Sequence, residues 1–177
     1  MAIERPKQNE LYEETASSYG AALERLARAY EADREIRRDL LQEIHIALWR
    51  SFEGFDGRCS LRTWVYRVAH NAAASHALRE RRTNSAIWVS LEQVDKGCDR
   101  GDTERKLQEQ DALNRLMALI RRLEPLDRRV ILGYLEGMDA TSIGEITGIS
   151  PGNVATKIHR VKNILARRFY KGGHHGK

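Results

Sequence analysis

The sequence predicts an all-α protein made of two small helical domains joined by a flexible linker. Apolar residues recur every three or four positions through most of the chain, which is the period of an amphipathic helix. This period is lost over residues 83–110, and a pair of short, capped helical segments follows near the C-terminal end, at 139–168. A chain of 177 residues can form one ordinary domain or two small ones. We therefore expect domains at 11–82 and 111–170, with 83–110 as the linker.

The segment 139–168 contains start and stop signals for two consecutive helices. Asp139 is a good N-cap for a short helix, and Gly148 can end it in a left-handed conformation. Ser150 can cap a second helix, in which Pro151 takes the first position, where a missing N–H costs nothing. Four apolar residues of this second helix fall on one face: Val154, Ile158, Val161 and Leu165.

The other face of the second helix is polar and basic. It carries Asn153, Thr156, Lys157, Arg160 and Lys162. Two short helices joined by a glycine turn, the second with a basic outer face, are typical of a DNA-binding helix-turn-helix. The alternative is an ordinary helical hairpin with a solvated face.

The charge distribution indicates two separate contacts with a polyanion. The formal net charge is +5. Residues 58–82 hold six arginines and one acid, and 139–177 hold seven basic residues and two acids. In contrast, 1–57 hold twelve acids and eight bases, and 83–110 hold six acids and four bases. Two basic regions separated by acidic ones fit a nucleic-acid ligand.

Two amphipathic helices are expected before residue 50, whereas the first ten residues show no apolar period and are expected to fray. The first helix presents Tyr19, Leu23, Leu26 and Tyr30 on one face. The second presents Ile36, Leu40, Ile44 and Leu48. The glycines that follow predict a loop from Ser51 to Ser60, which contains Phe55 and Arg58.

A third helix, from about Leu61 to Arg82, combines residue types that suit unpaired bases. Trp64, Arg67 and Asn71 fall in one row beside an expected buried stripe of Leu61, Val65, Val68 and Ala72. An aromatic ring can stack on a base, an amide can bond a base edge, and guanidinium groups attract phosphate. Arg79, Arg81 and Arg82 extend the positive charge. The alternative is that Trp64 belongs to the core and the arginines solvate the surface.

The remaining segments indicate no catalytic or metal chemistry. In the linker, Ile87, Val89 and Leu91 suggest a short extended piece, and the tail 171–177 is expected to be disordered. Cys59 and Cys98 are expected to be reduced thiols, and His45, His70 and His76 to be surface or boundary residues without metal partners. No cofactor motif, nucleophile motif, signal peptide or membrane span is recognisable, so we expect a cytoplasmic protein that is not an enzyme.

Blocks in both halves resemble bacterial RNA polymerase sigma factors of the extracytoplasmic-function (group IV) family. The first half contains D-L-L-Q-E-I-H-I-A-L-W and, after the glycine loop, S-L-R-T-W-V-Y-R-V-A-H-N, which are similar to the family's conserved region 2. The second half contains L-E-P-L-D-R-R-V-I-L-G-Y-L-E-G-M and S-I-G-E-I-T-G-I-S-P-G-N-V, which are similar to region 4.

The resemblance implies a protein that binds core RNA polymerase and directs it to promoter DNA, with an anti-sigma factor as a possible further partner. The implied polymerase contacts are Asp39, Gln42, Glu43 and Trp49. The implied contacts that recognise and open the −10 element are Phe55, Arg58, Trp64, Arg67, Asn71, Arg79, Arg81 and Arg82. The implied contacts to the −35 element are Ser150, Asn153, Thr156, Lys157, His159 and Arg160.

Departures from the family pattern concern both the −35 contacts and the polymerase-binding motif. Ala155 stands where the family often has a basic residue, and Lys157 where it often has arginine, so an unusual −35 preference is expected. The acidic run before the polymerase motif is diluted by Arg37 and Arg38, and one hypothesis is that phosphorylation of Thr63 supplies negative charge.

The alternative function is a helix-turn-helix regulator that binds duplex operator DNA on its own.

Overall fold

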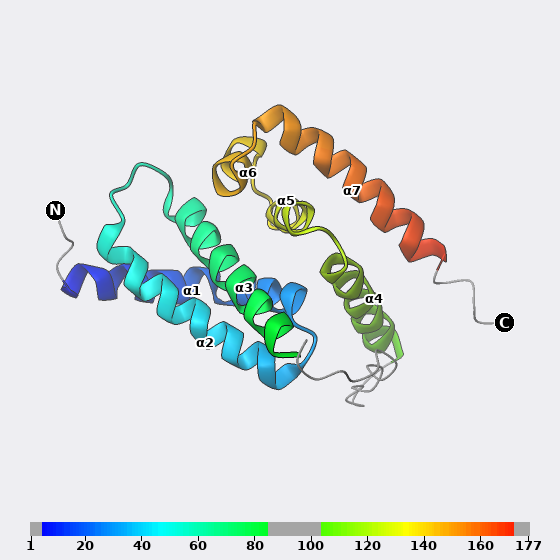
Figure 1. The fold of residues 1–177 in the computed structure, drawn as a ribbon, viewed down its shortest axis with the longest axis horizontal. Helices are drawn as coiled ribbons and strands as arrows, with labels where there is room; N and C mark the ends of the chain where they lie inside the picture. The colour runs from blue at the N-terminus through cyan, green and yellow to red at the C-terminus, as the bar shows by residue number, and fades with distance from the viewer. Residues whose placement is uncertain (1–4, 85–103, 172–177) are drawn as a thin grey trace.

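The computed structural model describes residues 5–84 and 104–171, and within these ranges every regular element is helical (Figure 1). The all-α prediction is confirmed. In chain order the elements are α1 (Arg5–Tyr30), α2 (Arg34–Ser51), the 3-10 turn η1 (Phe52–Gly54), α3 (Leu61–Asn84), α4 (Glu104–Arg121), α5 (Pro125–Leu135), α6 (Ala140–Thr147) and α7 (Pro151–Lys171).

Helices α1, α2 and α3 form the N-terminal half. Asp33 caps α2 by accepting hydrogen bonds from the backbone N–H groups of Glu35 and Ile36, at 2.8 and 3.1 Å. The predicted inner faces of the first two helices are buried at Leu23, Leu26, Tyr30, Leu40, Ile44 and Leu48.

The N-terminal residues differ from expectation. Instead of fraying, the chain is helical from Arg5 onward, and Gln8 is buried. The Gln8 side-chain amide donates a 2.7 Å hydrogen bond to the backbone oxygen of Trp49 on α2. A polar side chain that bonds across to another helix leaves no trace in an apolar period, and this is why the sequence pattern missed it.

The buried face of α3 was predicted only in part. Its central residues are Val65, Tyr66, Ala69, His70 and Ala73, while Leu61, Val68 and Ala72 are only half-buried. Helix α3 packs against α1 and α2 and also against α5 and α6, so it buries a wider face than a single stripe. Two histidines expected at the surface or its boundary, His70 and His76, are accordingly buried.

Helices α4 to α7 form the C-terminal half, and α6 and α7 are the predicted helix-turn-helix. Asp139 caps α6 by accepting from the N–H of Ser142 at 2.8 Å. Gly148 ends the helix with φ of 78°, and Pro151 is the first residue of α7. Val154, Val161 and Leu165 are buried, and Ile158 is half-buried, as expected.

The segment between the halves is shorter than predicted, because α3 continues to Asn84 and α4 begins at Glu104. The expected extended piece around Val89, as well as Cys98 and the C-terminal residues 172–177, lies outside the described residues. Cys59 is a half-buried free thiol. None of the helices in the described ranges combines the length and the apolar character that crossing a bilayer requires.

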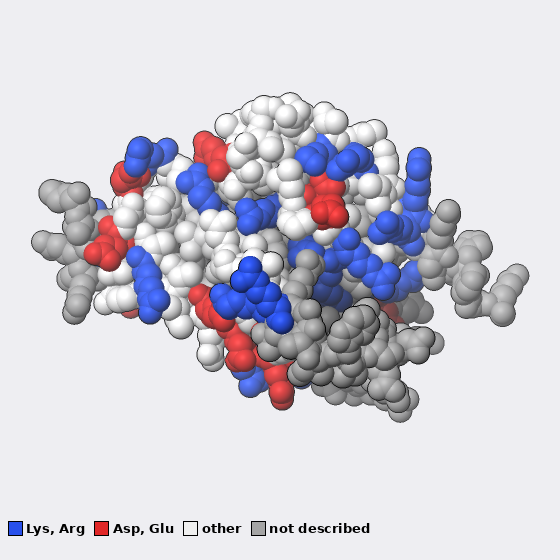
Figure 2. Space-filling model, viewed as in Figure 1, with Lys and Arg blue, Asp and Glu red and all other residues white. Residues whose placement is uncertain are grey.

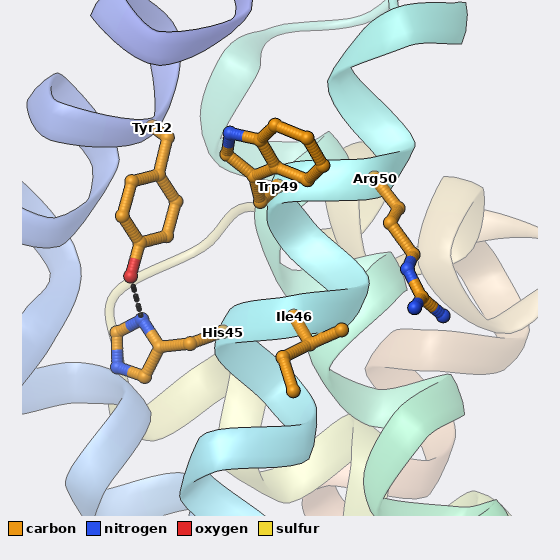
Figure 3. Close-up of a pocket in the computed structure, with 5 residues that line it drawn as sticks. All are labelled: Tyr12, His45, Ile46, Trp49 and Arg50. Atoms are coloured by element: carbon orange, nitrogen blue, oxygen red, sulfur yellow. Dashed lines mark hydrogen bonds between the residues drawn. The ribbon is translucent and has the colours of Figure 1, made fainter.

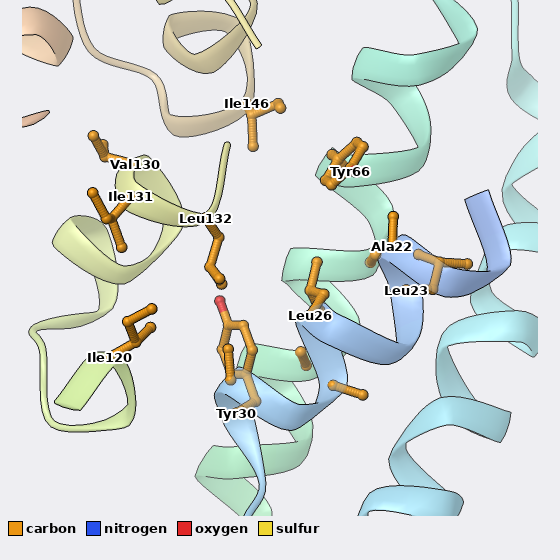
Figure 4. Packing of buried hydrophobic residues seen from close by; sticks show 14 of the residues in the cluster. Ala22, Leu23, Leu26, Tyr30, Tyr66, Ile120, Val130, Ile131, Leu132 and Ile146 are labelled. Atoms are coloured by element: carbon orange, nitrogen blue, oxygen red, sulfur yellow. The ribbon is translucent and has the colours of Figure 1, made fainter. Parts of the chain in front are cut away.

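The two halves pack directly on each other. α3 contacts α5 and α6, and α1 contacts α4. Figure 4 shows Leu132 of α5 directed toward the Tyr30 hydroxyl and Leu26 of α1, with Tyr66 and Ile146 facing one another above them. The guanidinium of Arg128 lies 4.9 Å from the centre of the Tyr30 ring. The buried apolar residues of both halves thus form one continuous cluster.

Candidate nucleic-acid and polymerase interfaces

The turn between α6 and α7 depends on a close backbone approach. A Cβ atom on Gly144 would lie 2.7 Å from the backbone oxygen of Ile149, closer than real Cβ contacts. Only glycine allows the two helices to meet in this way. The outer residues of α7 are then presented to solvent: Ser150, Asn153, Thr156, His159 and Arg160 are exposed, and Lys157 is half-buried.

Two basic residues of α7 share one carboxylate. Asp127, in the first turn of α5, accepts a hydrogen bond from Lys157 Nζ at 2.8 Å and from an Arg160 guanidinium nitrogen at 2.6 Å. Lys157 and Arg160 also line an open hollow with Ile149, Asn153 and Thr156. The structure thus brings together five residues at the start of α7, of which four were predicted −35 contacts and the fifth is their neighbour Ile149. It adds Asp127, which the sequence analysis missed.

The loop residues and Trp64 form an aromatic pair. The rings of Phe55 and Trp64 lie 5.3 Å apart at an angle of 60°, and Trp64 donates a 3.0 Å hydrogen bond to Ser51 Oγ. Trp64 is half-buried, so its ring both packs against the core and borders the loop. Arg58 is exposed at the loop tip and bonds Asp56.

The other predicted contacts on α3 have different surroundings. Asn71 is exposed, and Arg67 donates a 3.2 Å hydrogen bond to the backbone oxygen of Glu145 on α6. Arg79 pairs with Glu43, and Arg82 is exposed. The side chain of Arg81 lies outside the described residues. The C-terminal half therefore lies against part of the surface predicted to meet the −10 element.

The predicted polymerase surface lies on α2. Asp39 and Gln42 are exposed, whereas Glu43 also bonds His76 Nδ1 at 3.2 Å. Burial opposes ionisation of Glu43, but the hydrogen bonds from Arg79 and His76 outweigh it and lower the pKa of this carboxyl.

Trp49 borders a hollow between α1 and α2, shown in Figure 3 with Tyr12, His45, Ile46 and Arg50. Ile46 is 51% exposed and Trp49 is 38% exposed. Tyr12 and His45 are joined by a 3.1 Å hydrogen bond, and burial lowers the pKa of His45. Exposed apolar side chains bordered by polar ones suit a protein partner. Ile46 was missed, although its position off the apolar stripe could have revealed it.

A polar cluster around Glu136 joins the two halves and was also missed. Its carboxylate accepts from Arg25 at 2.7 and 2.8 Å and from the Tyr66 hydroxyl at 3.2 Å, while Arg62 donates to its backbone oxygen. Burial opposes ionisation of Glu136, but the hydrogen bond and charge of Arg25, together with the Tyr66 hydroxyl and the charge of Arg62, outweigh it and lower the pKa of this carboxyl. Burial, together with this carboxylate, raises the pKa of Tyr66. We call these residues the Glu136 cluster.

The hypothesis that Thr63 is phosphorylated stays a prediction. Thr63 is buried, and its hydroxyl oxygen accepts a 2.9 Å hydrogen bond from Ser60. A kinase cannot reach this hydroxyl without unfolding the start of α3.

Within the described ranges, no three potential ligand side chains from His, Cys, Asp or Glu gather as a metal ion would require.

Basic side chains are spread over both halves of the molecule, with acidic ones between them, on the face shown in Figure 2. Together with the helix-turn-helix and the aromatic pair, this distribution defines a two-part helical protein of the DNA-binding class.

Comparisons with known proteins specify the class further. The family model for Sigma-70 region 2 matches residues 15–83, and that for Sigma-70 region 4 matches residues 113–165.

The chain belongs to the extracytoplasmic-function sigma factors. It is 28% identical over 138 residues to the ECF RNA polymerase sigma-E factor of Haemophilus influenzae, covering 74% of this chain and 73% of the relative. It is 26% identical over 142 residues to the ECF RNA polymerase sigma factor SigW of Bacillus subtilis, covering 74% of each.

Two solved structures share the fold. One is CnrH in complex with the cytosolic domain of CnrY, with a TM-score of 0.65 over 94% of this chain and 97% of that one. The other is the sigma factor RpoE in complex with the anti-sigma factor NepR from Bartonella quintana, with a TM-score of 0.68 over 90% and 96%. Both are 18% identical to this chain.

Proposed function

We propose that this sigma factor binds core RNA polymerase in the cytoplasm and directs it to promoters by contacting the −35 and −10 elements with separate halves. The observation that carries the proposal is the presence of two unlike nucleic-acid surfaces in one chain. A capped helix-turn-helix suits intact duplex, whereas an aromatic pair beside an exposed amide suits unpaired bases.

At the −35 element, α7 enters the major groove. The exposed side chains of Asn153, Thr156, His159 and Arg160 face the base edges, with Lys157 beside them. Ser150, at the N-terminal end of the helix, is placed for a phosphate contact. Arg160 can use the guanidinium nitrogens that Asp127 leaves available, since arginine has five donors.

At the −10 element, α3 and the preceding loop capture bases as the duplex opens. Extruding a base costs a few kcal/mol, and stacking on one aromatic side chain returns roughly 1–3 kcal/mol. Phe55 and Trp64 supply an apolar wall, and the exposed Asn71 supplies hydrogen bonds to a base edge. Arg58, Arg79, Arg81 and Arg82 supply positive charge.

Polymerase binds to α2 through Asp39, Gln42 and Glu43, with Trp49 and Ile46 adding apolar area at the edge. This assignment is supported by the exposure of charged and apolar side chains on the same helix. Arg67 bonds α6 while the two halves pack on each other, which we call the closed arrangement, so separation of the halves would free all the donors of this arginine for DNA. An anti-sigma factor that binds the closed arrangement would keep the protein inactive.

In vitro transcription with purified core polymerase tests the function. The chain should enable initiation at promoters that core polymerase alone does not use, and it should bind the same promoters weakly without polymerase. Tight binding to duplex DNA by the chain alone, with no new initiation by polymerase, would instead identify a helix-turn-helix regulator.

A further inference from the structure

Asp127 lies behind the DNA-facing side of α7, at the point where α5 begins. Its side chain is 9% exposed, compared with 26% for Lys157 and 57% for Arg160. The carboxylate engages both cations at once, with one oxygen on each. We propose that Asp127 is a positioning residue that sets the −35 sequence preference by fixing where Lys157 and Arg160 point. This inference rests on the proposed −35 role of α7.

The geometry restrains the two cations strongly. A carboxylate that is almost fully buried requires charged or hydrogen-bonding partners, and here Lys157 and Arg160 provide them. If either side chain turned away to follow a different base, Asp127 would lose part of that compensation. Long basic side chains otherwise have many rotamers available, and a fixed anchor reduces the entropy lost when they meet a base.

The same carboxylate also weakens attraction to phosphate. Lys157 and Arg160 carry two positive charges, and Asp127 cancels one of them close to the DNA surface. Affinity for DNA of any sequence comes mainly from neutralising phosphates, so Asp127 lowers that affinity. A group that lowers general affinity while directing two side chains favours discrimination between sequences. Removing its charge should therefore change discrimination and general affinity in opposite directions.

A structural role of Asp127 predicts a different pattern. A negative charge in the first turn of α5 is favourable to the helix dipole, so its loss could simply weaken the C-terminal half. In that case binding to the −35 element and to unrelated duplex would decrease together, and the protein would melt at a lower temperature.

The test compares full-length wild-type chain with the D127N variant, each assembled with core polymerase. Promoters with a randomised −35 element are selected by each holoenzyme, and the affinity of each free chain for non-promoter duplex is measured across salt concentrations. The matched control is D111N, because Asp111 is an exposed aspartate on α4.

We expect D127N to lose at least about fivefold in discrimination between preferred and other −35 sequences, the lower end of what one good base contact provides. Its affinity for non-promoter duplex should rise, with a salt slope steeper by about 0.9 if one more phosphate is neutralised. The D111N control should match wild type in both measurements.

Unchanged −35 preferences in D127N, or a joint decrease of specific and general affinity, would overturn the inference. If D127N does not fold, D127E replaces it, since the longer carboxylate keeps the charge and moves both cations. D127E should then show altered preferences at unchanged general affinity, and wild-type preferences would overturn the proposal. Failure of the wild-type holoenzyme to initiate anywhere would instead refute the proposed function, on which the inference rests.

Discussion

The Glu136 cluster makes the closed arrangement of the two halves testable by a single substitution. Glu136→Gln keeps the size and one acceptor oxygen, but it removes the charge that binds Arg25 through two hydrogen bonds of 2.7 and 2.8 Å. Hydrogen bonds to charged groups contribute about 1.5–3 kcal/mol when buried. Arg25 is 48% exposed, so solvent reduces this contribution, and we expect about 1 kcal/mol. That corresponds to a closed-to-open ratio about fivefold lower.

The assay is a distance measurement between the halves by paired spin labels. Exposed positions are available on both, at Ser75 of α3 and Ala166 of α7, with the native cysteines replaced by serine. The Glu136→Gln variant should show a larger population at long distance. The matched control is Glu145→Gln, because Glu145 contacts Arg67 through its backbone oxygen and keeps that contact when its side chain changes.

The pH dependence has a definite sign. Because the Glu136 pKa lies below its ordinary value of 4.5, its charge stabilises the closed arrangement above that pH, and this stabilisation is lost as the pH falls through the lowered pKa. Measurements near neutral pH therefore observe the full effect. Identical distance distributions for wild type and Glu136→Gln at neutral pH would refute the assignment of the cluster as a restraint on opening.

Four further changes test other parts of the molecule. Asn71→Ala should impair promoter opening more than closed-complex formation, so permanganate reactivity of promoter thymines should fall; undiminished reactivity would count against the role of Asn71. Arg160→Ala should weaken the −35 footprint of the holoenzyme, and an intact footprint would exclude this contact. Burial and the nearby arginines of α5 lower the pKa of His70 from 6.5 to about 3. As the pH falls, His70 therefore binds a proton in the unfolded chain before it does so in the folded chain, and the free energy of unfolding should fall below pH 6.5. By about pH 5 this loss of unfolding free energy is about 2 kcal/mol, and urea titrations should find a smaller loss in His70→Gln. An equal loss in both proteins would show that His70 is not its cause. Gly144→Ala should destabilise the C-terminal half by about 1–3 kcal/mol, because the new Cβ would meet the backbone oxygen of Ile149; unchanged urea unfolding would contradict that contact.

Local signals in the sequence were sufficient for most of the fold. The helix-turn-helix was predicted in detail because each of its signals is carried by one residue, such as the cap at Asp139 and the left-handed Gly148. The inner faces of α1 and α2 were predicted because an apolar period reports burial on one side. An apolar period could not predict the whole buried face of α3, because this helix is packed on more than one side and buries His70, which a hydropathy pattern counts as polar.

The exposure of several candidate residues was predictable from the sequence, but their pairings were not. Exposure of Asn71 and Arg160 follows from their place on the polar faces of their helices. The anchoring of Arg160 by Asp127, and the joining of Arg25 to Glu136 across 111 positions of sequence, depend on tertiary packing that no local pattern encodes. Long-range polar contacts of this kind determine which surfaces are accessible in the closed arrangement.

Three arginine contacts between the halves end on main-chain oxygens rather than on side chains. Arg62 donates to Glu136, Arg67 to Glu145, and Arg121 to Arg28. A carbonyl is present whatever residue occupies the position, so mutation of the acceptor side chain leaves these three bonds intact. When these three bonds break, no ionised acceptor is left behind, and the freed guanidinium groups of Arg62 and Arg67 carry donors that can bond phosphate oxygens. Under the proposed function, these two side chains would exchange internal carbonyls for phosphate oxygens.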